Sequence, residues 1–229
     1  MTYGTPTYRL DARPRGVATT TVAGVTATQD SHTTDPVAEV SAEFRRRLLD
    51  GMAAAIEERG FRDSTVADVV RHARTSRRTF YEHFANKQAC LIVLLQEMSS
   101  RIAHQIEAAV DGHSPLETQA RQAIEAWIAA SESSRALTVS WIRDLPSLGS
   151  AGRQVQRGWL DMFSALVQRL ANTPELLASG VSPPSRQTAI MLVGGLRELI
   201  AVTVEDGDAI SGIIDVAVDC VLAVLGPRH

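Results

Sequence analysis

Apolar residues recur every three or four positions along most of this chain, which is the spacing of amphipathic helices. The first stripe starts after Asp35-Pro36, an N-cap residue followed by proline at the first helical position, and it ends at Gly60. No run alternates apolar and polar residues for more than a few positions, and aromatic residues make up only 5% of the chain. The pattern predicts an all-α protein.

Two short helices are predicted within residues 65–86. The first begins at Thr65, with Asp68 three residues later as a capping box. The second begins at Ser76 and places Phe80 and Phe84, four residues apart, on its buried side. Two short helices joined by so tight a break indicate a helix-turn-helix.

Longer stripes predict further helices in residues 87–110, 116–128, 135–145 and 155–170. The segment Ser114-Pro115-Leu116-Glu117 has the pattern of a capping box with proline at the first helical position. Pro146 is expected to end the helix in residues 135–145.

The last two helices, in residues 185–204 and 208–225, are apolar around most of their circumference. A helix that is apolar on every side needs neighbours on every side, and Gly194-Gly195 would let two backbones approach closely. We therefore predict that these helices hold a homodimer together. The residues expected in the subunit interface are Gly194, Gly195, Leu196, Leu199, Ile214, Val218 and Val221.

The composition of successive segments indicates how the chain is divided into domains. Residues 1–34 contain few large apolar groups and are predicted to be a disordered tail, followed by a helix-turn-helix domain in residues 35–86 and a larger helical domain in residues 87–229. The two cysteines lie far apart and no Cys/His spacing fits a metal site, so no disulfide framework, metal or cofactor is expected. The chain has no signal segment and no apolar run of roughly 18 residues, which predicts a cytoplasmic protein without membrane contact.

Charge points to a polyanionic partner for one part of the chain. The net charge is −3, but residues 37–90 are basic whereas residues 91–229 are acidic. On the helix that begins at Ser76, the side chains of Arg77, Arg78 and Tyr81 lie together on the side opposite the buried phenylalanines. Guanidinium groups, a phenol and a helix N-terminus are groups that hold phosphates and read guanine edges.

Thr65 and Lys87, at two neighbouring helix N-termini, are placed to contact phosphates on either side of this face. The alternative is that the face is only a solvated charged surface beside a small core. A helical adaptor that binds another protein would have such a surface, and salt-dependent binding to DNA distinguishes the two hypotheses.

Residues 60–91, GFRDSTVADVVRHARTSRRTFYEHFANKQACL, resemble the DNA-binding signature of the TetR (tetracycline repressor) family. The matching elements include Gly60-Phe61, Ser64-Thr65-Val66, Thr79-Phe80-Tyr81, His83-Phe84 and Lys87. The resemblance implies an all-helical homodimer of about nine helices per chain, with three N-terminal helices for DNA and the remainder for a small-molecule effector and dimerisation. It implies a repressor that leaves a pseudo-palindromic operator when its effector binds.

Carried over residue by residue, the resemblance implies DNA contacts at a set of polar residues in the helix-turn-helix. With Arg74 and Thr79, which lie between them, the predicted DNA-binding residues are Thr65, Arg74, Thr75, Ser76, Arg77, Arg78, Thr79, Tyr81, His83 and Lys87. Arg74 departs from the family, which usually has glycine there. A positive φ is expected at this position, and a non-glycine residue in that conformation costs roughly 1 kcal/mol.

Few other residues suggest an effector pocket or a catalytic site. Candidates to line an effector pocket, or else to form plain core, are Trp127, Trp141, Trp159, Met162, Phe163 and Met191. An enzyme would need a nucleophile beside a base, but Cys90 and His104 lie about 21 Å apart along one helix. The sequence therefore predicts a ligand-responsive regulator rather than an enzyme.

Overall fold

The computed structural model describes residues 36–227, and every secondary-structure element in this part of the chain is helical. The predicted all-α class is confirmed. The predicted tail in residues 1–34 and the predicted N-cap at Asp35 lie outside the described residues. In chain order the elements are α1 (Pro36–Asp63), α2 (Val66–His72), α3 (Arg77–His83), α4 (Lys87–Ala109), α5 (Leu116–Ser133), α6 (Arg135–Val139), η1 (Ser140–Asp144), η2 (Leu145–Leu148), α7 (Gly149–Leu170), α8 (Pro174–Ala178), α9 (Arg186–Asp206), η3 (Ile210–Ile213) and α10 (Ile214–Leu225).

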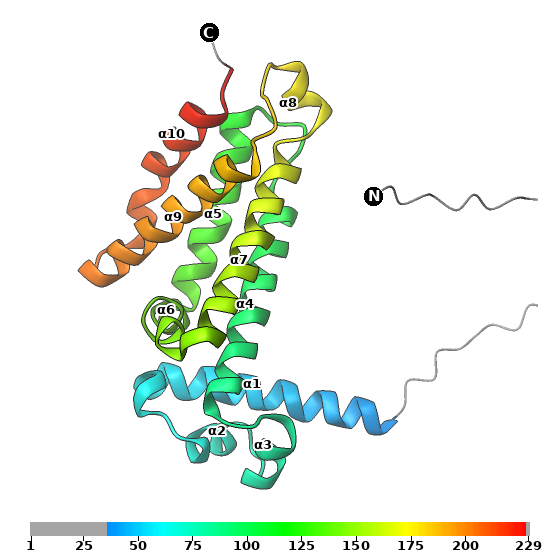
Figure 1. The fold of residues 1–229 in the computed structure, drawn as a ribbon, viewed down its shortest axis with the longest axis vertical. Helices are drawn as coiled ribbons and strands as arrows, with labels where there is room; N and C mark the ends of the chain where they lie inside the picture. Colours follow the sequence, from blue (N-terminus) through cyan, green and yellow to red (C-terminus); the bar gives the residue numbers. More distant parts are fainter. Residues whose placement is uncertain (1–35, 228–229) are drawn as a thin grey trace, which may run out of the picture. The chain divides into compact units, whose positions relative to one another are not determined.

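The helices α1, α2 and α3 pack around a small apolar core (Figure 1). Val69 of α2 and Phe80 of α3 are fully buried, and Phe84 is nearly so. They pack with the buried side chains of Leu48 and Met52 on α1. The inward orientation predicted for both phenylalanines is confirmed, and it leaves the other side of α3 exposed.

Two glycines determine the geometry of α1. Gly60 has φ 75° and ψ 162°, so the regular helix is interrupted there, as the sequence predicts. Gly51 faces α2: a Cβ atom at this position would lie 2.5 Å from the carbonyl oxygen of Val69. The backbones of α1 and α2 are therefore in contact, and only glycine allows that approach.

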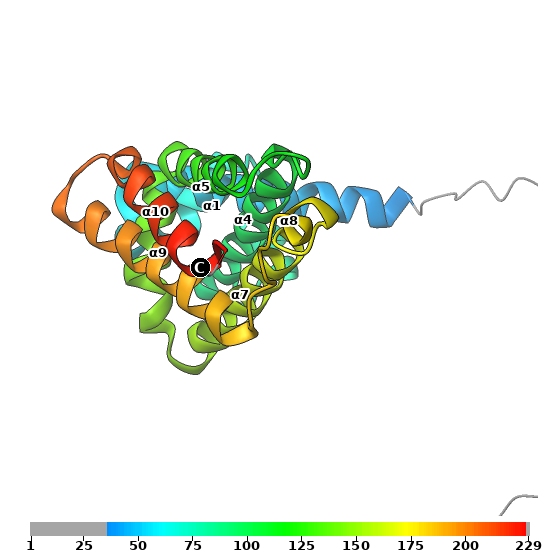
Figure 2. The same ribbon diagram turned by 90° about the horizontal axis from the view of Figure 1, so that it is seen from above.

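The remaining long helices form a ring, seen end-on in Figure 2. In this ring α4 packs on α5, α5 on α10, α10 on α9, α9 on α7, and α7 on α4. The helix α4 runs from the helix-turn-helix into the ring and joins the two parts (Figure 1). The short elements α6 and η1 pack against α1 at the end of the ring nearest the helix-turn-helix.

Two local predictions are wrong. The helix expected in residues 135–145 is not one α-helix: it continues from α6 as a π-helical turn, η1, and then as the 3₁₀ turn η2, which contains Pro146. The expected capping box at Ser114 does not form, because the Ser114 hydroxyl donates to the Asp111 carboxylate instead and Pro115 occupies the cap position. The helix boundary itself is where the proline predicts it.

The helix α9 is long and apolar enough, by length and composition alone, to cross a membrane, with a mean hydropathy of 1.4. Its sequence is nevertheless not one apolar run of about 18 residues, because Arg197 and Glu198 interrupt it. The helix α9 packs along α7, and these two residues form an ion pair of 2.9 Å in its middle. Its apolar residues are those of a helix that packs in a bundle.

Candidate DNA-binding surface and effector cavity

The exposed face of α3 is created by its cap and its core. Ser76 is the N-cap, with φ −104° and ψ 158°, and its hydroxyl accepts from the backbone N–H of Thr79 at 3.0 Å. On the inner side the rings of Phe80 and Phe84 contact each other, with centroids 5.7 Å apart. Tyr81 is consequently 58% exposed. The structure brings Tyr81 to the same outer face as the two arginines at the start of the helix.

The cationic groups on this face differ in how far they are neutralised. Arg78 forms an ion pair of 3.1 Å with Glu82, but both side chains are largely exposed, so the pair is weak. Arg74 and Arg77 are exposed and form no ion pair with another residue of the described chain. These two guanidinium groups are the ones most available to a polyanion.

The turn between α2 and α3 contains the expected strain. Arg74 has φ 49°, the only positive φ at a non-glycine residue in the described chain. The guanidinium of Arg47 on α1 donates to the carbonyl oxygens of Ala73 and Arg74, the latter at 2.6 Å. The backbone N–H of Thr75 closes the turn on Val70 at 3.0 Å. Arg47 therefore stabilises the strained turn from outside, a role that no local sequence pattern reveals.

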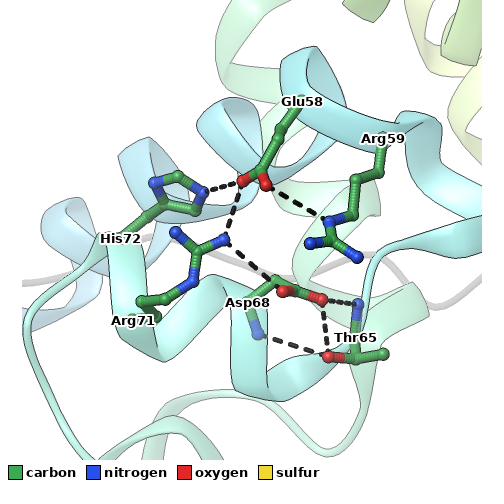
Figure 3. A network of polar contacts seen from close by, with 6 residues as sticks. All are labelled: Glu58, Arg59, Thr65, Asp68, Arg71 and His72. Carbon is green, nitrogen blue, oxygen red and sulfur yellow. Dashed lines mark hydrogen bonds and ion pairs between the residues drawn. The ribbon is translucent and has the colours of Figure 1, made fainter.

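A network of charged groups ties α2 to α1 (Figure 3). The Glu58 carboxylate accepts from Arg71 at 2.7 Å and is 2.8 Å from His72 Nε2. These hydrogen bonds, with Arg71 first, lower the pKa of Glu58 to about 2. Arg71, one of the basic residues near the turn, is thus engaged within the protein.

Thr65 is engaged in the same network. Its hydroxyl donates to Asp68 at 2.7 Å and accepts from the Asp68 backbone N–H, and its own backbone N–H also donates to Asp68. The predicted capping box is confirmed, and it lowers the pKa of Asp68 to about 2. Because both donors of Thr65 serve the cap, the expected phosphate contact at Thr65 would have to break it.

The ammonium group of Lys87 is also directed inward. Its Nζ donates to the carbonyl oxygens of Phe61 and Ser64, both at 2.7 Å, and to that of Arg62 at 3.3 Å. It also lies 4.3 Å from the centroid of the Phe61 ring. Burial lowers the pKa of Lys87, while Asp144 and Asp63 act in the opposite direction. In this geometry the Lys87 ammonium holds the junction of α1 and α4 together.

The other predicted contact residues lie near the α3 face. Thr75, Thr79 and His83 are half-buried. The Thr79 hydroxyl is 2.9 Å from that of Ser76, and the His83 ring lies 6.5 Å from the Phe84 ring. They are peripheral to the exposed group formed by Arg74, Arg77 and Tyr81.

The larger domain contains a cavity of about 670 Å³ inside the helical ring, and this cavity opens to solvent at Met191, Val202 and Val216. Residues of α4, α5, α7, α8, α9 and α10 line it, and almost all of their side chains are apolar. Among the described lining residues the only polar side chains besides the Trp127 indole are Gln119, Glu198 and Cys220, and none is cationic. A cavity of this size and character suits a mainly apolar small molecule.

Half of the predicted pocket residues line this cavity. Trp127, Phe163 and Met191 do, whereas Trp141, Trp159 and Met162 do not. Trp159 packs between the others instead, with ring centroids 5.8 Å from Trp127 and 5.6 Å from Trp141. The aromatic residues thus form one continuous cluster that leads from the cavity to η1, where Trp141 lies.

The predicted dimer residues mostly face inward. Gly195, Leu196, Leu199 and Val221 line the cavity, Val218 is 1% exposed, and Ile214 packs against the core. The sequence argument assumed that such apolar helices need a second subunit, but α7 covers part of α9 and α5 covers part of α10 within the chain. The exposed large apolar residues of α9 and α10 are Met191, Val202 and Val216, which line the cavity where it opens to solvent. No described atom lies within 4 Å of a Cβ built at Gly194 or Gly195, so these glycines make no close approach within the described chain.

One buried carboxylate joins the two parts of the chain. Asp144, in η1, is 6% exposed, and its Oδ1 accepts from Arg62 of α1 at 3.2 Å.

Cys90, the candidate nucleophile, is fully buried, and burial raises the pKa of its thiol to about 12. A thiol with this pKa carries almost no thiolate at neutral pH.

A capped, exposed helix on a small core, beside a turn that Arg47 stabilises, has the arrangement of a helix-turn-helix. Residues 48–94 match the family model "Bacterial regulatory proteins, tetR family", so this part of the chain is a helix-turn-helix of the TetR family. Over 60 residues it is 35% identical to the uncharacterized HTH-type transcriptional regulator YdgC of Bacillus subtilis (strain 168). That match covers 26% of this chain and 31% of the length of that protein.

Solved structures share the fold over a much larger part of the chain. The fatty acid degradation regulator FadR from Bacillus halodurans has a TM-score of 0.63 and 19% identity, covering 81% of this chain and 96% of that one. FadR from Bacillus subtilis, solved in complex with stearoyl-CoA, has a TM-score of 0.61 and 16% identity, covering 80% and 99%. At these identities the likeness concerns the fold.

Proposed function

We propose that this protein is a transcriptional repressor that binds a pseudo-palindromic operator as a homodimer and leaves it when a small apolar effector binds. The observation that carries the proposal is the outer face of α3, where Arg77 and Tyr81 are exposed beside the exposed Arg74 of the turn. Such a regulator acts in the bacterial cytoplasm, on the nucleoid when bound to DNA.

In this proposal α3 enters the major groove with its N-terminus towards the bases. Arg77 and Arg78, in the first turn, are suited to the O6 and N7 acceptors of guanine. Arg74 and Tyr81 flank them and are suited to phosphates. Lys87 and Thr65 then act indirectly, by holding α4 and α2 in the positions from which α3 is presented.

A dimer through α9 and α10, formed around the opening of the cavity, is consistent with the exposed apolar residues there. Met191 and Val202 on α9, with Val216 on α10, are each about half exposed in the single chain. A symmetric partner would cover them and present two copies of α3 to half-sites about one helical turn apart or somewhat more.

Effector binding would reach the helix-turn-helix through the aromatic cluster. Trp127 contacts the cavity, Trp159 links it to Trp141 in η1, and η1 ends at Asp144, which holds Arg62 of α1. A ligand that shifts this cluster biases the position of α1 and hence of α3. For near-complete release it must favour the DNA-incompetent state by about 5.5 kcal/mol.

The test is a selection of binding sites from random double-stranded DNA, followed by titration over a range of salt concentrations. We expect enrichment of a palindrome, and Arg77→Ala should lower discrimination at particular base pairs by about 1–3 kcal/mol. Arg157→Ala is the matched control, because Arg157 is an equally exposed arginine on α7, outside the helix-turn-helix. If no sequence is enriched and both variants behave as the wild type, α3 is only surface and the adaptor hypothesis replaces this one.

A further inference from the structure

The wall of the cavity contains a buried hydrogen-bond acceptor that has no partner in the described chain. Almost none of its surface is exposed, so a ligand reaches it only by displacing neighbouring side chains of the wall. Gln119, near the N-terminus of α5, lines the cavity and is 4% exposed. Its Oε1 makes no hydrogen bond to any described residue. An unsatisfied amide oxygen in apolar surroundings costs free energy, and native proteins rarely leave one without a reason.

The orientation of this amide is fixed by its other end. The Nε2 of Gln119 donates to the carbonyl oxygens of Gly112 and Ser114, at 3.0 and 2.7 Å. Two carbonyl acceptors require the NH₂ group on that side, so the free atom is the oxygen. The unsatisfied Gln119 Oε1 therefore needs a hydrogen-bond donor as its partner.

We propose that the effector is an apolar molecule with a hydrogen-bond donor at one end, such as a hydroxyl or an amine, which bonds to Gln119 Oε1. This proposal rests on the proposed function and specifies the ligand class of the same cavity. A carboxylate or a thioester presents only acceptors to Gln119 and finds no cationic side chain among the described lining residues. The one charged lining residue, Glu198, repels anions as well.

Four ten-carbon probes separate these chemistries: 1-decanol, decylamine, the ether 1-methoxydecane and decanoate. Affinity for the full-length protein is measured by tryptophan fluorescence below the micellar concentration, since Trp127 lines the cavity. We expect the alcohol and the amine to bind roughly tenfold more tightly than the ether and decanoate. The ether keeps the oxygen and the chain but lacks the donor.

Gln119→Leu should abolish the preference, bringing the ratio of alcohol to ether affinity to about one while the ether still binds. The control is Gln122→Leu: Gln122 accepts from the Asp111 backbone N–H at 2.9 Å and so holds the same loop, but it does not line the cavity. It should keep the tenfold ratio of the wild type. Thermal melting of both variants reports any loss of folding.

Three outcomes overturn the proposal: no wild-type preference for alcohol over ether, a preference that survives Gln119→Leu, or no binding by any probe. A preference for decanoate would indicate an acyl effector instead. Operator release is measured separately with the probes that bind. If the ratios are as expected but DNA affinity is unchanged, the cavity chemistry stands and the proposed control of DNA binding fails.

Discussion

Replacement of Lys87 by methionine tests whether this residue serves the fold or the DNA. Met keeps most of the aliphatic stem over the Phe61 ring but removes the donors to the carbonyls of Phe61 and Ser64. A hydrogen bond from a charged donor contributes about 1.5–3 kcal/mol, and part of this is offset by the desolvation of the ammonium group. We expect a net loss of about 2–3 kcal/mol in the free energy of unfolding for Lys87→Met.

For a domain of this size, that loss corresponds to a fall in Tm of about 5–10 °C, measurable by circular dichroism. DNA binding gives the complementary measurement, at a temperature where the variant is folded. If Lys87 does not contact a phosphate, the slope of log affinity against log salt is unchanged. A lost phosphate contact would reduce that slope by about one unit.

Arg77→Ala is the matched control, because Arg77 is exposed and forms no ion pair within the described chain. It should leave the free energy of unfolding within about 0.5 kcal/mol of the wild type and lower discrimination at particular base pairs. A Lys87→Met variant with the Tm of the wild type and a salt slope reduced by one unit would refute our interpretation. Lys87 would then be a phosphate ligand, as the resemblance to the TetR family implies.

Three further predictions concern the junctions of α1. Glu58→Gln should lower the urea midpoint of unfolding at neutral pH. The pKa of Glu58 is about 2 in the folded protein and ordinarily 4.5. The loss of stability in the variant should therefore be full above pH 4.5 and should shrink as the pH falls towards 2. Gly51→Ala should cost about 1–3 kcal/mol and weaken DNA binding, since its Cβ would push α2 off α1, whereas Gly158→Ala, with nothing within 4 Å, should be neutral or stabilising. Asp144→Asn should leave effector affinity unchanged but reduce the effector-induced loss of operator affinity by about 0.5–2 kcal/mol, measured by titrations with and without effector.

Each of these three predictions would be contradicted by a particular result. A Glu58→Gln difference that persists unchanged at pH 3 would place the stabilising charge elsewhere. Equal melting temperatures for the two glycine variants would mean that α2 adapts to the added methyl group. Undiminished release by effector in Asp144→Asn would show that the signal takes another route to α1.

Several local features of the helix-turn-helix were determined by the sequence alone. The caps at Thr65 and Ser76 and the inward phenylalanines depend on residues within a few positions of one another, whereas the positive φ at Arg74 was implied by the resemblance and its turn is stabilised by the distant Arg47. Capping and helical periodicity act over one or two turns, so the order of residues specifies them. For the same reason the exposed position of Arg77 followed from the pattern.

Tertiary structure decided where the long-range partners lie. Lys87 reaches carbonyls more than twenty positions earlier, and the inner faces of α9 and α10 meet α7 and α5 of the same chain. Gln119 shares a face with Leu116, so its place in an apolar stripe was visible, but the vacancy of its oxygen was not. Periodicity shows which side of a helix is apolar, yet only packing decides which element covers that side and which polar atoms are left without a partner.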